Sequence, residues 1–466
     1  MFSFSYYNIL VAVLGISIAL APRAESQSET SPIPRRLTLM QAENLLVERN
    51  FTILAGKYQV EADRAARLIA AYKPNPVLTA GAEQFPFYSP LAGSFPRFAT
   101  TNPDAGANPV YTLRIDKIWE RGGKREFRTT LADEQLRASE AQMLDAIRTQ
   151  IFQLRSAFTA ATLAKENIRL AEITEQQYAQ TKSLTQVKVD QGDIAKVEIY
   201  RVSAGRLQYQ QAVLQASTAY DAAIRQILNL LGAREKDIEP ATTDAKAVAA
   251  GTSDQLLSTP QMLESIHNAP LELSGDFNDR PVLETREELR AMALAERPDV
   301  IAARHLLASA ESASQIARAQ RSRDIDIAYE YQRTGSDHTA GVVVQVPLFL
   351  SNDQRALFTQ AEAQRRAAEA QLKQAELQAL TDVDKAYQSY LSARRILELY
   401  NTQNLSQVEK LRDIAALSYK EGASSLFELL DAQRAYSSAM TAYAQARSDY
   451  EMTLWGLEQA TGRSLR

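Results

Sequence analysis

Two short stretches decide how this chain folds: QGDIAKVE at residues 191–198 and EGASSLFE at residues 421–428. A long segment without proline precedes each stretch, and a shorter one follows it. Glycine has no Cβ and accepts the left-handed backbone that ends many helices, so Gly192 and Gly422 are expected to cap helices. Each stretch therefore predicts the tip of a long antiparallel helical hairpin.

The two hairpins belong to two copies of one unit, which is the sequence signature of internal duplication. In each copy the expected order is helix, two strands, long helix, glycine turn and shorter helix. The first copy spans 37–232 and the second 286–463, and a proline-containing linker or equatorial segment at 233–285 joins them. Corresponding residues include Glu48 and Glu296, Arg49 and Arg297, Gly123 and Gln354, and Gly192 and Gly422.

The lengths of the expected helices predict four packed rods of equal height. At 1.5 Å per residue the descending legs measure about 100 Å, the ascending legs about 57 Å and the helices before the strands about 50 Å. A short helix stacked end to end on an ascending leg therefore equals one descending leg. The segments are Lys124–Gln191 and Arg355–Glu421 (descending), Asp193–Leu231 and Ser424–Ala460 (ascending), and Met40–Tyr72 and Arg286–Ala319 (before the strands). A soluble coiled coil or spectrin-like rod is the alternative at this point.

Four segments alternate apolar and polar residues with the period of a β-strand. They lie at 77–85, 111–116, 325–332 and 342–349, and loops at 86–108 and 333–339 connect them in pairs. Such segments suit tilted strands that cross an outer membrane, although strands of a soluble two-faced sheet also alternate. Four strands are too few to close a barrel, and open strand edges cannot face lipid. The membrane interpretation therefore requires several copies of the chain in a symmetric ring.

Composition excludes several classes of function. The chain has no Cys and only three His, and its net charge is −4. Thiolate chemistry, a histidine-based metal site and an electrostatic nucleic-acid surface are therefore not expected, and no catalytic triad, phosphate loop or zinc motif is present. We expect no enzyme activity and no cofactor. A short apolar run at 9–21 indicates a signal peptide within residues 1–24.

The duplicated plan, the ERPDV stretch at 296–300 and the LLDAQ stretch at 429–433 resemble the TolC-like outer membrane efflux protein family. The resemblance implies a mainly α-helical homotrimer. Its twelve-stranded β-barrel would lie in the outer membrane of a Gram-negative bacterium and continue into a twelve-helix α-barrel tunnel in the periplasm.

The segment WERGGKR at 119–125 is similar to the branch of this family that serves heavy-metal pumps of the RND type. It lies at the expected barrel–tunnel junction. There Gly122 and Gly123 would bend strand into helix, and Lys124 and Arg125 would lie at the membrane edge.

The same resemblance implies a periplasmic gate or selectivity site at the second hairpin tip, formed by Tyr419, Glu428 and Asp431, with Glu198 of the first hairpin as an acidic partner. Ser424 stands where the family has a tip arginine. Ser425 and Glu428 also have the spacing of a helix capping box, so Glu428 is either a cap or a gate residue. Asp431 lies beyond the cap, and three copies of it would form a ring that favours cations.

The resemblance and the exposed turns together predict the partners and the function. A periplasmic adaptor (membrane fusion) protein is expected to bind the tips, at Gln191, Gly192, Asp193, Glu421, Gly422 and Ala423. The chain is then a passive exit duct of a tripartite pump, with heavy-metal cations as the favoured substrate. Drug efflux and type I protein secretion are alternatives within this class, and a non-channel periplasmic coiled-coil scaffold is the alternative outside it.

Overall fold

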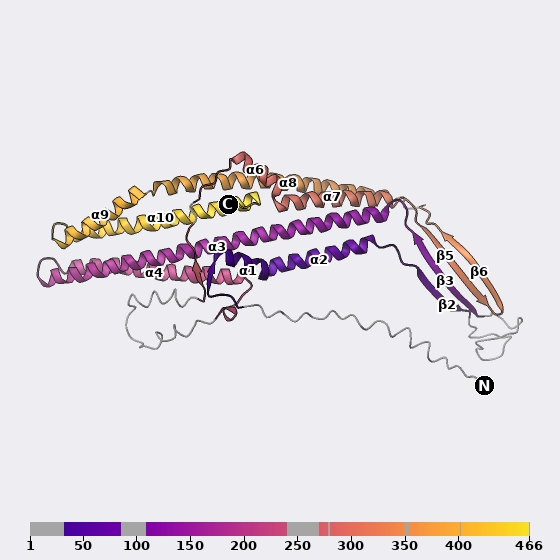
Figure 1. Ribbon diagram of the computed structural model, residues 1–466, viewed down its shortest axis with the longest axis horizontal. Helices are drawn as coiled ribbons and strands as arrows, with labels where there is room; N and C mark the ends of the chain where they lie inside the picture. The colour runs from indigo at the N-terminus through magenta and orange to yellow at the C-terminus, as the bar shows by residue number, and fades with distance from the viewer. Residues whose placement is uncertain are drawn as a thin grey trace, which may run out of the picture.

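The computed structural model describes residues 32–84, 109–239, 270–277, 280–349, 354–400 and 402–465. The expected signal peptide, the loop at 86–108 and most of the linker at 233–285 lie outside these residues. The described chain is elongated, with long helices over most of its length and a small sheet at one end (Figure 1). Among the described residues, none of the helices combines the length and the apolar character that crossing a lipid bilayer requires.

The two halves of the chain repeat the same order of helices and strands. The first half contains β1 (Arg36–Thr38), α1 (Leu39–Arg49), α2 (Phe51–Ala71), β2 (Val77–Glu83), β3 (Val110–Trp119), α3 (Lys124–Asp190), α4 (Val197–Leu230) and η1 (Glu235–Asp237). The second half contains β4 (Glu272–Ser274), α6 (Arg286–Glu296), α7 (Pro298–Ala319), β5 (Ile325–Thr334), β6 (Asp337–Gln345), α8 (Arg355–Leu399), α9 (Thr402–Lys420) and α10 (Leu426–Thr461). The short strands β1 and β4 pair in parallel beside the middle of the molecule.

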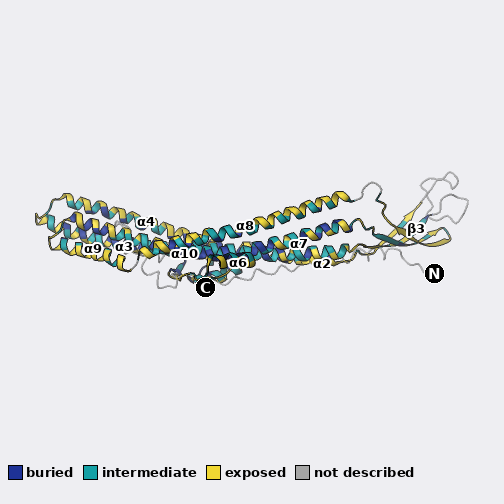
Figure 2. Cartoon of the chain, turned by 90° about the horizontal axis from the view of Figure 1, so that it is seen from above, coloured by how far each residue is buried: buried dark blue, intermediate teal, exposed yellow. Residues whose placement is uncertain are grey.

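The helices form the expected packed rods. Toward the sheet, α3 packs against α2 and α7, and α7 packs against α8. Toward the hairpin tips, α3 packs against α4 and α10, and α10 packs against α9. Figure 2 shows the buried residues along these packed helices, whereas the sheet is mostly exposed or half-buried.

Each helix expected before the strands is in fact two helices. The expected helix Met40–Tyr72 breaks at Asn50, and Arg286–Ala319 breaks at Arg297. Asn50 has an extended backbone, and its side chain accepts hydrogen bonds from the N–H groups of Thr52 and Ile53, so it caps α2. Arg297 precedes Pro298, whose ring disfavours a helical conformation in the residue before it.

The ends of the ascending helices α4 and α10 contact the two breaks, at Asn50 and Arg297 respectively. The Asn50 amide donates to the carbonyl of Leu230 at 2.7 Å, and the Arg297 guanidinium donates to the carbonyl of Ala460 at 3.3 Å. Gly232 and Gly462 follow these helices with positive φ angles. A Cβ on Gly462 would lie 3.0 Å from the Cα of Arg297. We call these two places the waist joints, and they explain how a short helix and an ascending leg share one rod.

The second descending leg is not the single helix Arg355–Glu421 that its seam pattern predicts. It consists of α8 and α9, separated where Tyr400 has φ −92° and ψ 48°. The side-chain amide of Asn404 donates to the carbonyl of Leu399 at 2.8 Å, which satisfies a carbonyl that the break leaves without a helical partner. No proline or glycine lies at this position, and the apolar seam continues across it, so the sequence predicted one continuous helix.

The four longer strands form one antiparallel sheet in the order β2-β3-β5-β6. Its register places apolar residues of neighbouring strands on one face, such as Ile115 opposite Tyr329 and Tyr329 opposite Val342. The first strand ends at Glu83, two residues before its predicted end. The predicted loop 333–339 is instead a tight hairpin that turns at Gly335 and Ser336, because Gly335 supplies a positive φ. The strands β2 and β6 form the two edges of the sheet.

Candidate functional site: the hairpin tips and the strand–helix junction

The two hairpin tips have the same backbone geometry. Gly192 and Gly422 have φ angles of 84° and 79°, as the cap prediction requires. The N–H of Asp193 donates to the carbonyl of Lys188 at 2.9 Å, and the N–H of Ala423 donates to that of Ser418 at 2.8 Å, so both helices end in a Schellman motif. All six residues predicted to bind an adaptor are exposed: Gln191, Gly192, Asp193, Glu421, Gly422 and Ala423.

Tyr419 joins the two hairpins just above their tips. Its side chain is 2% exposed, and its hydroxyl lies 3.0 Å from that of Thr185 on α3. The Thr185 hydroxyl donates to the carbonyl of Thr181 at 2.7 Å, so the Tyr419 hydroxyl is the donor between the hairpins. The Lys188 ammonium donates to the Tyr419 carbonyl at 2.6 Å and lies 4.6 Å from the centre of its ring. We call Thr185, Lys188 and Tyr419 the tip latch.

A small apolar core supports the latch. It contains Tyr178, Val202 and Tyr209 of the first hairpin and Tyr419, Leu426, Leu429 and Leu430 of the second. A Cβ on Gly205 would lie 2.5 Å from the ring of Tyr178, so α4 approaches α3 closely at this point. Burial raises the pKa of Tyr178 to about 12, which keeps its hydroxyl neutral. Moving one hairpin away from the other would expose this core.

The structure assigns a capping role to Glu428. The N–H of Ser425 donates to the Glu428 carboxylate at 3.4 Å, and the N–H of Glu428 donates to the Ser425 hydroxyl at 3.3 Å. These reciprocal bonds form the capping box at the start of α10. Asp431 lies one turn further along α10, is exposed, and takes no part in the cap.

Glu198 faces the second hairpin but pairs within its own helix. Its carboxylate lies 2.9 Å from the Arg201 guanidinium. Both residues line a groove of about 490 Å³ between the tips, together with Lys188, Tyr419 and Ser424. The Ser424 hydroxyl is buried and has no hydrogen-bond partner among the described residues. Within this chain the tip latch therefore connects the two hairpins beside this groove.

At the other end of α3, two glycines turn strand into helix. Gly122 and Gly123 have φ angles of 77° and 74°. A Cβ on Gly122 would lie 2.6 Å from the Ser322 hydroxyl oxygen, so this position also requires the absence of a side chain. In the second half, Gln354 precedes α8 with φ 63°, the same left-handed conformation as its counterpart Gly123.

Ion pairs fix the direction in which α3 leaves the sheet. The Lys124 ammonium lies 2.8 Å from the Asp324 carboxylate, which also accepts a hydrogen bond from the N–H of Arg121 at 2.9 Å. The Arg128 guanidinium pairs with the Glu120 carboxylate at 2.8 Å. These contacts therefore tie the start of α3 to the residues that follow β3 and precede β5. Arg125 lines a pocket at this junction.

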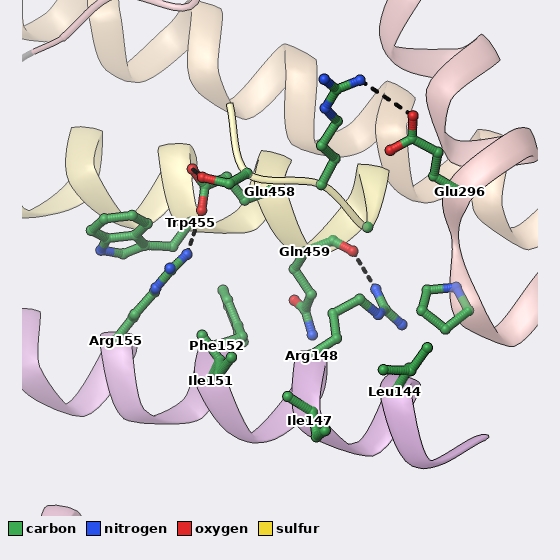
Figure 3. Close-up of a pocket in the computed structure, with 14 residues that line it drawn as sticks. Leu144, Ile147, Arg148, Ile151, Phe152, Arg155, Glu296, Trp455, Glu458 and Gln459 are labelled. Atoms are coloured by element: carbon green, nitrogen blue, oxygen red, sulfur yellow. Dashed lines mark hydrogen bonds and ion pairs between the residues drawn. The ribbon is translucent and has the colours of Figure 1, made fainter. Parts of the chain in front are cut away.

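A partly buried charge network at the waist was not foreseen from the sequence. The Arg155 guanidinium pairs with Glu43 at 2.6 Å and with Glu458, and it lies 4.4 Å from the centre of the Trp455 ring. Figure 3 shows Arg155 and Glu458 meeting between α3 and α10, beside a cavity of about 370 Å³. The network ties three helices that are remote in sequence, so only the folded chain reveals it.

These sites are suited to docking and to holding helices together. In the ranges that the structure describes, no three His, Asp or Glu side chains are grouped so that they could hold a metal ion. The tips offer exposed turns, a groove and an exposed carboxylate at Asp431, and the junction offers cations beside an apolar sheet face.

Residues 289–463 match the family described as outer membrane efflux protein. The alkaline protease secretion protein AprF of Pseudomonas aeruginosa is 24% identical over 354 residues, which are 73% of this chain and 65% of that protein. The match thus spans just under two thirds of that relative.

Two solved structures of outer-membrane channels share the fold. OprN is 20% identical with a TM-score of 0.70, covering 92% of this chain and 90% of its own. MtrE of Neisseria gonorrhoeae, solved in its open state, is 18% identical with a TM-score of 0.69, covering 92% of this chain and 89% of its own. These likenesses confirm the predicted fold class.

Proposed function

Because residues 289–463 belong to the outer membrane efflux protein family and the chain has the fold of outer membrane channels, we propose that this protein is the exit duct of a tripartite efflux system. It is an outer membrane protein of a Gram-negative bacterium, and the family is one of channels and not of enzymes. The duct is passive, and an inner-membrane partner supplies the energy.

The sheet is the observation that carries this proposal. One face exposes apolar residues such as Leu113, Tyr329 and Val342, while Arg114 on the other face pairs with Asp116 at 2.7 Å and with Glu330 at 3.6 Å. An apolar outer face and a charged inner face are typical of strands around a water-filled lumen in a membrane. The outer edges of β2 and β6 pair with no strand of the described chain, and lipid cannot form hydrogen bonds with their backbone groups. We propose a homotrimer in which β2 of one copy pairs with β6 of the next.

The helical tips support the proposed partners. Exposed turns at Gly192 and Gly422 project at the end of the molecule opposite the sheet (Figure 1). If the sheet lies in the outer membrane, these tips lie deepest in the periplasm. There they would bind a periplasmic adaptor protein, which links the duct to an inner-membrane pump of the RND type.

Heavy-metal cations remain the substrate class that we propose, on the resemblance of residues 119–125 to the metal branch. An exposed Asp431 near the tip suits the passage of cations. The likeness to an alkaline protease secretion protein favours polypeptide export as the second candidate within the same class. A periplasmic scaffold without a channel is the candidate outside it.

A strain that lacks the gene tests both the proposed channel and the proposed substrate class. Complementation with the gene should restore resistance to a panel of heavy-metal salts, and the protein should fractionate with outer membranes and resist extraction by mild detergent. Restored protease secretion without restored metal resistance would reassign the substrate class. Release of the protein by washing without detergent would support the scaffold and contradict the channel.

A further inference from the structure

The strand–helix junction contains a pocket of about 430 Å³, here called the junction pocket. It lies between the end of β3, the first turn of α3 and the segment before β2, and four of its lining residues are cations: Lys73, Lys117, Lys124 and Arg125. We propose that the junction pocket binds the phosphodiester of an anionic phospholipid in the periplasmic leaflet of the outer membrane. This inference rests on the proposed function, because it requires the sheet to lie in that membrane.

Some of the charge around the pocket is already neutralised. Lys124 forms its ion pair with Asp324 at 2.8 Å. The carboxylate of Glu120, which also lines the pocket, is held by both terminal nitrogens of Arg128 at 2.8 and 3.3 Å. These two pairs cancel and leave no net charge for a ligand.

The remaining charge is positive. Lys117 donates to the carbonyl of Pro74 at 2.8 Å, which orients its ammonium group without neutralising it. Lys73 and Arg125 have no ion pair with any described residue. Glu126 is the one other carboxylate that lines the pocket. Three cations therefore face one carboxylate, a balance that favours an anionic ligand.

The position of the pocket points to a lipid. Along β3 the side chains of Ile115, Lys117 and Trp119 alternate onto the apolar face of the sheet, and Trp119 is 54% exposed. An apolar face that ends in a lysine and then a tryptophan marks the boundary between hydrocarbon and headgroups. Lys117 and Trp119 therefore place the pocket at headgroup depth on the side where α3 begins.

The lining groups match the chemistry of a phosphodiester. A guanidinium such as that of Arg125 binds two phosphate oxygens at once, and the ammonium groups of Lys73 and Lys117 act as point charges beside it. The exposed ring of Trp119 would contact the glycerol and the upper acyl chain. A zwitterionic headgroup would bring its own cation toward the three cations of the pocket, so an anionic headgroup is favoured.

Tryptophan fluorescence measures this preference directly. The chain has two tryptophans, and Trp455 is 3% exposed at the waist, so quenching by lipid reports on Trp119. The full-length protein is placed in phosphatidylcholine nanodiscs that contain a small fraction of either brominated phosphatidylglycerol or brominated phosphatidylcholine with the same acyl chains. We expect the brominated phosphatidylglycerol to quench Trp119 several-fold more strongly.

A matched pair of variants assigns the preference to the pocket. The double substitution Lys73→Gln and Arg125→Gln should lower the phosphatidylglycerol preference by at least about threefold, since it removes two of the three positive charges that attract the anionic headgroup. Lys385→Gln with Arg395→Gln removes two exposed cations from α8 and should leave the preference unchanged. Native electrophoresis checks that all variants assemble like the parent protein.

The outcomes separate this inference from the proposed function. Equal quenching by both brominated lipids would overturn the lipid site while leaving the sheet in the bilayer. Quenching by neither lipid would contradict insertion and therefore the channel itself. Loss of the preference in inorganic phosphate, but not in chloride of equal ionic strength, would show a site for free phosphate and overturn the lipid assignment.

Discussion

The hydroxyl of Tyr419 lies 3.0 Å from the hydroxyl of Thr185, although 234 residues separate them in the chain. Both side chains are buried, and the Lys188 ammonium, on the same helix as Thr185, donates to the Tyr419 carbonyl at 2.6 Å. In a duct whose entrance lies at the tips, this bond would hold the second hairpin against the first.

Removing the latch hydroxyl should favour opening. Tyr419→Phe keeps the ring and the contact with Lys188 but loses a hydrogen bond worth about 1 kcal/mol, or about a fivefold shift in the open population. Single-channel recording in planar bilayers would measure the fraction of time that the channel is open. Tyr200→Phe, at an exposed tyrosine of α4, is the matched control and should change nothing. An unchanged open population in Tyr419→Phe would exclude the latch from gating.

Glu428 and Asp431, the two acidic residues nearest the start of α10, should behave differently. Asp431→Asn removes an exposed charge and should reduce cation selectivity in reversal-potential measurements. Glu428→Gln retains the capping box, because glutamine also serves at that position, and should preserve both selectivity and stability. Selectivity that falls in Glu428→Gln and not in Asp431→Asn would reverse the assignment.

A substitution at Arg297, in the second waist joint, should lower the free energy of unfolding far more than a substitution at the surface. Arg297 is buried and pairs with Asp299 at 2.8 Å and Asp382 at 3.0 Å. Arg297→Met leaves these carboxylates without their partner and should lower the free energy of unfolding by about 3–5 kcal/mol. Arg304→Gln breaks an exposed pair with Glu376 and should cost less than about 1 kcal/mol. Denaturant unfolding midpoints would compare the two variants. Equal losses of stability in both would contradict the stabilising role of Arg297 in the second waist joint.

Glu172 should make the helical hairpin less stable as pH rises. Its side chain is 7% exposed, one carboxylate oxygen has no hydrogen-bond partner in the described chain, and burial raises its pKa above the usual 4.5. The folded state therefore holds this proton at a pH where the unfolded chain has lost it. Stability then falls as pH rises from about 4.5 through the raised pKa.

Glu172→Gln tests the sign of this effect. The substitution should raise the melting temperature at pH 8 and have little effect at pH 4, because glutamine resembles the protonated carboxyl. A variant that is destabilised at pH 8 would show that the carboxylate is stabilised by a partner. Glu166→Gln, at a half-buried glutamate of the same helix that pairs with Arg169 at 2.5 Å, is the control and should not show this gain.

The parts of the fold that depend on one residue type could be predicted from the sequence. Gly192, Gly422 and Gly123 mark positions that need a left-handed backbone, and Gln354 adopts the same conformation where the duplication placed it. The S-x-x-E spacing at 425–428 likewise identified the capping box, although it left open whether Glu428 was also a gate residue.

The contacts between distant segments could not be predicted. Thr185 and Lys188 resemble many other polar residues on the surface of a long helix, and only the fold, which brings the end of α9 to α3, makes them partners of Tyr419. The same holds for Arg155 and Glu458 at the waist. The helix break at Tyr400 could not be predicted because the apolar seam continues across it. The break at Arg297, in contrast, was predictable from Pro298.

The account depends most on the pairing of β2 with β6 of a neighbouring copy. The chain has no Cys, so one cysteine in each edge strand gives an unambiguous crosslink. Cysteines at Leu78, Ala80 or Ala82 would be combined with cysteines at Ala340, Val342 or Val344, all on the apolar face. After oxidation in native outer membranes, at least one double-cysteine variant should give crosslinked dimers and trimers but no larger species. The corresponding single-cysteine variants should give no such series. Monomers alone in every pair, with the protein in the membrane, would contradict the ring.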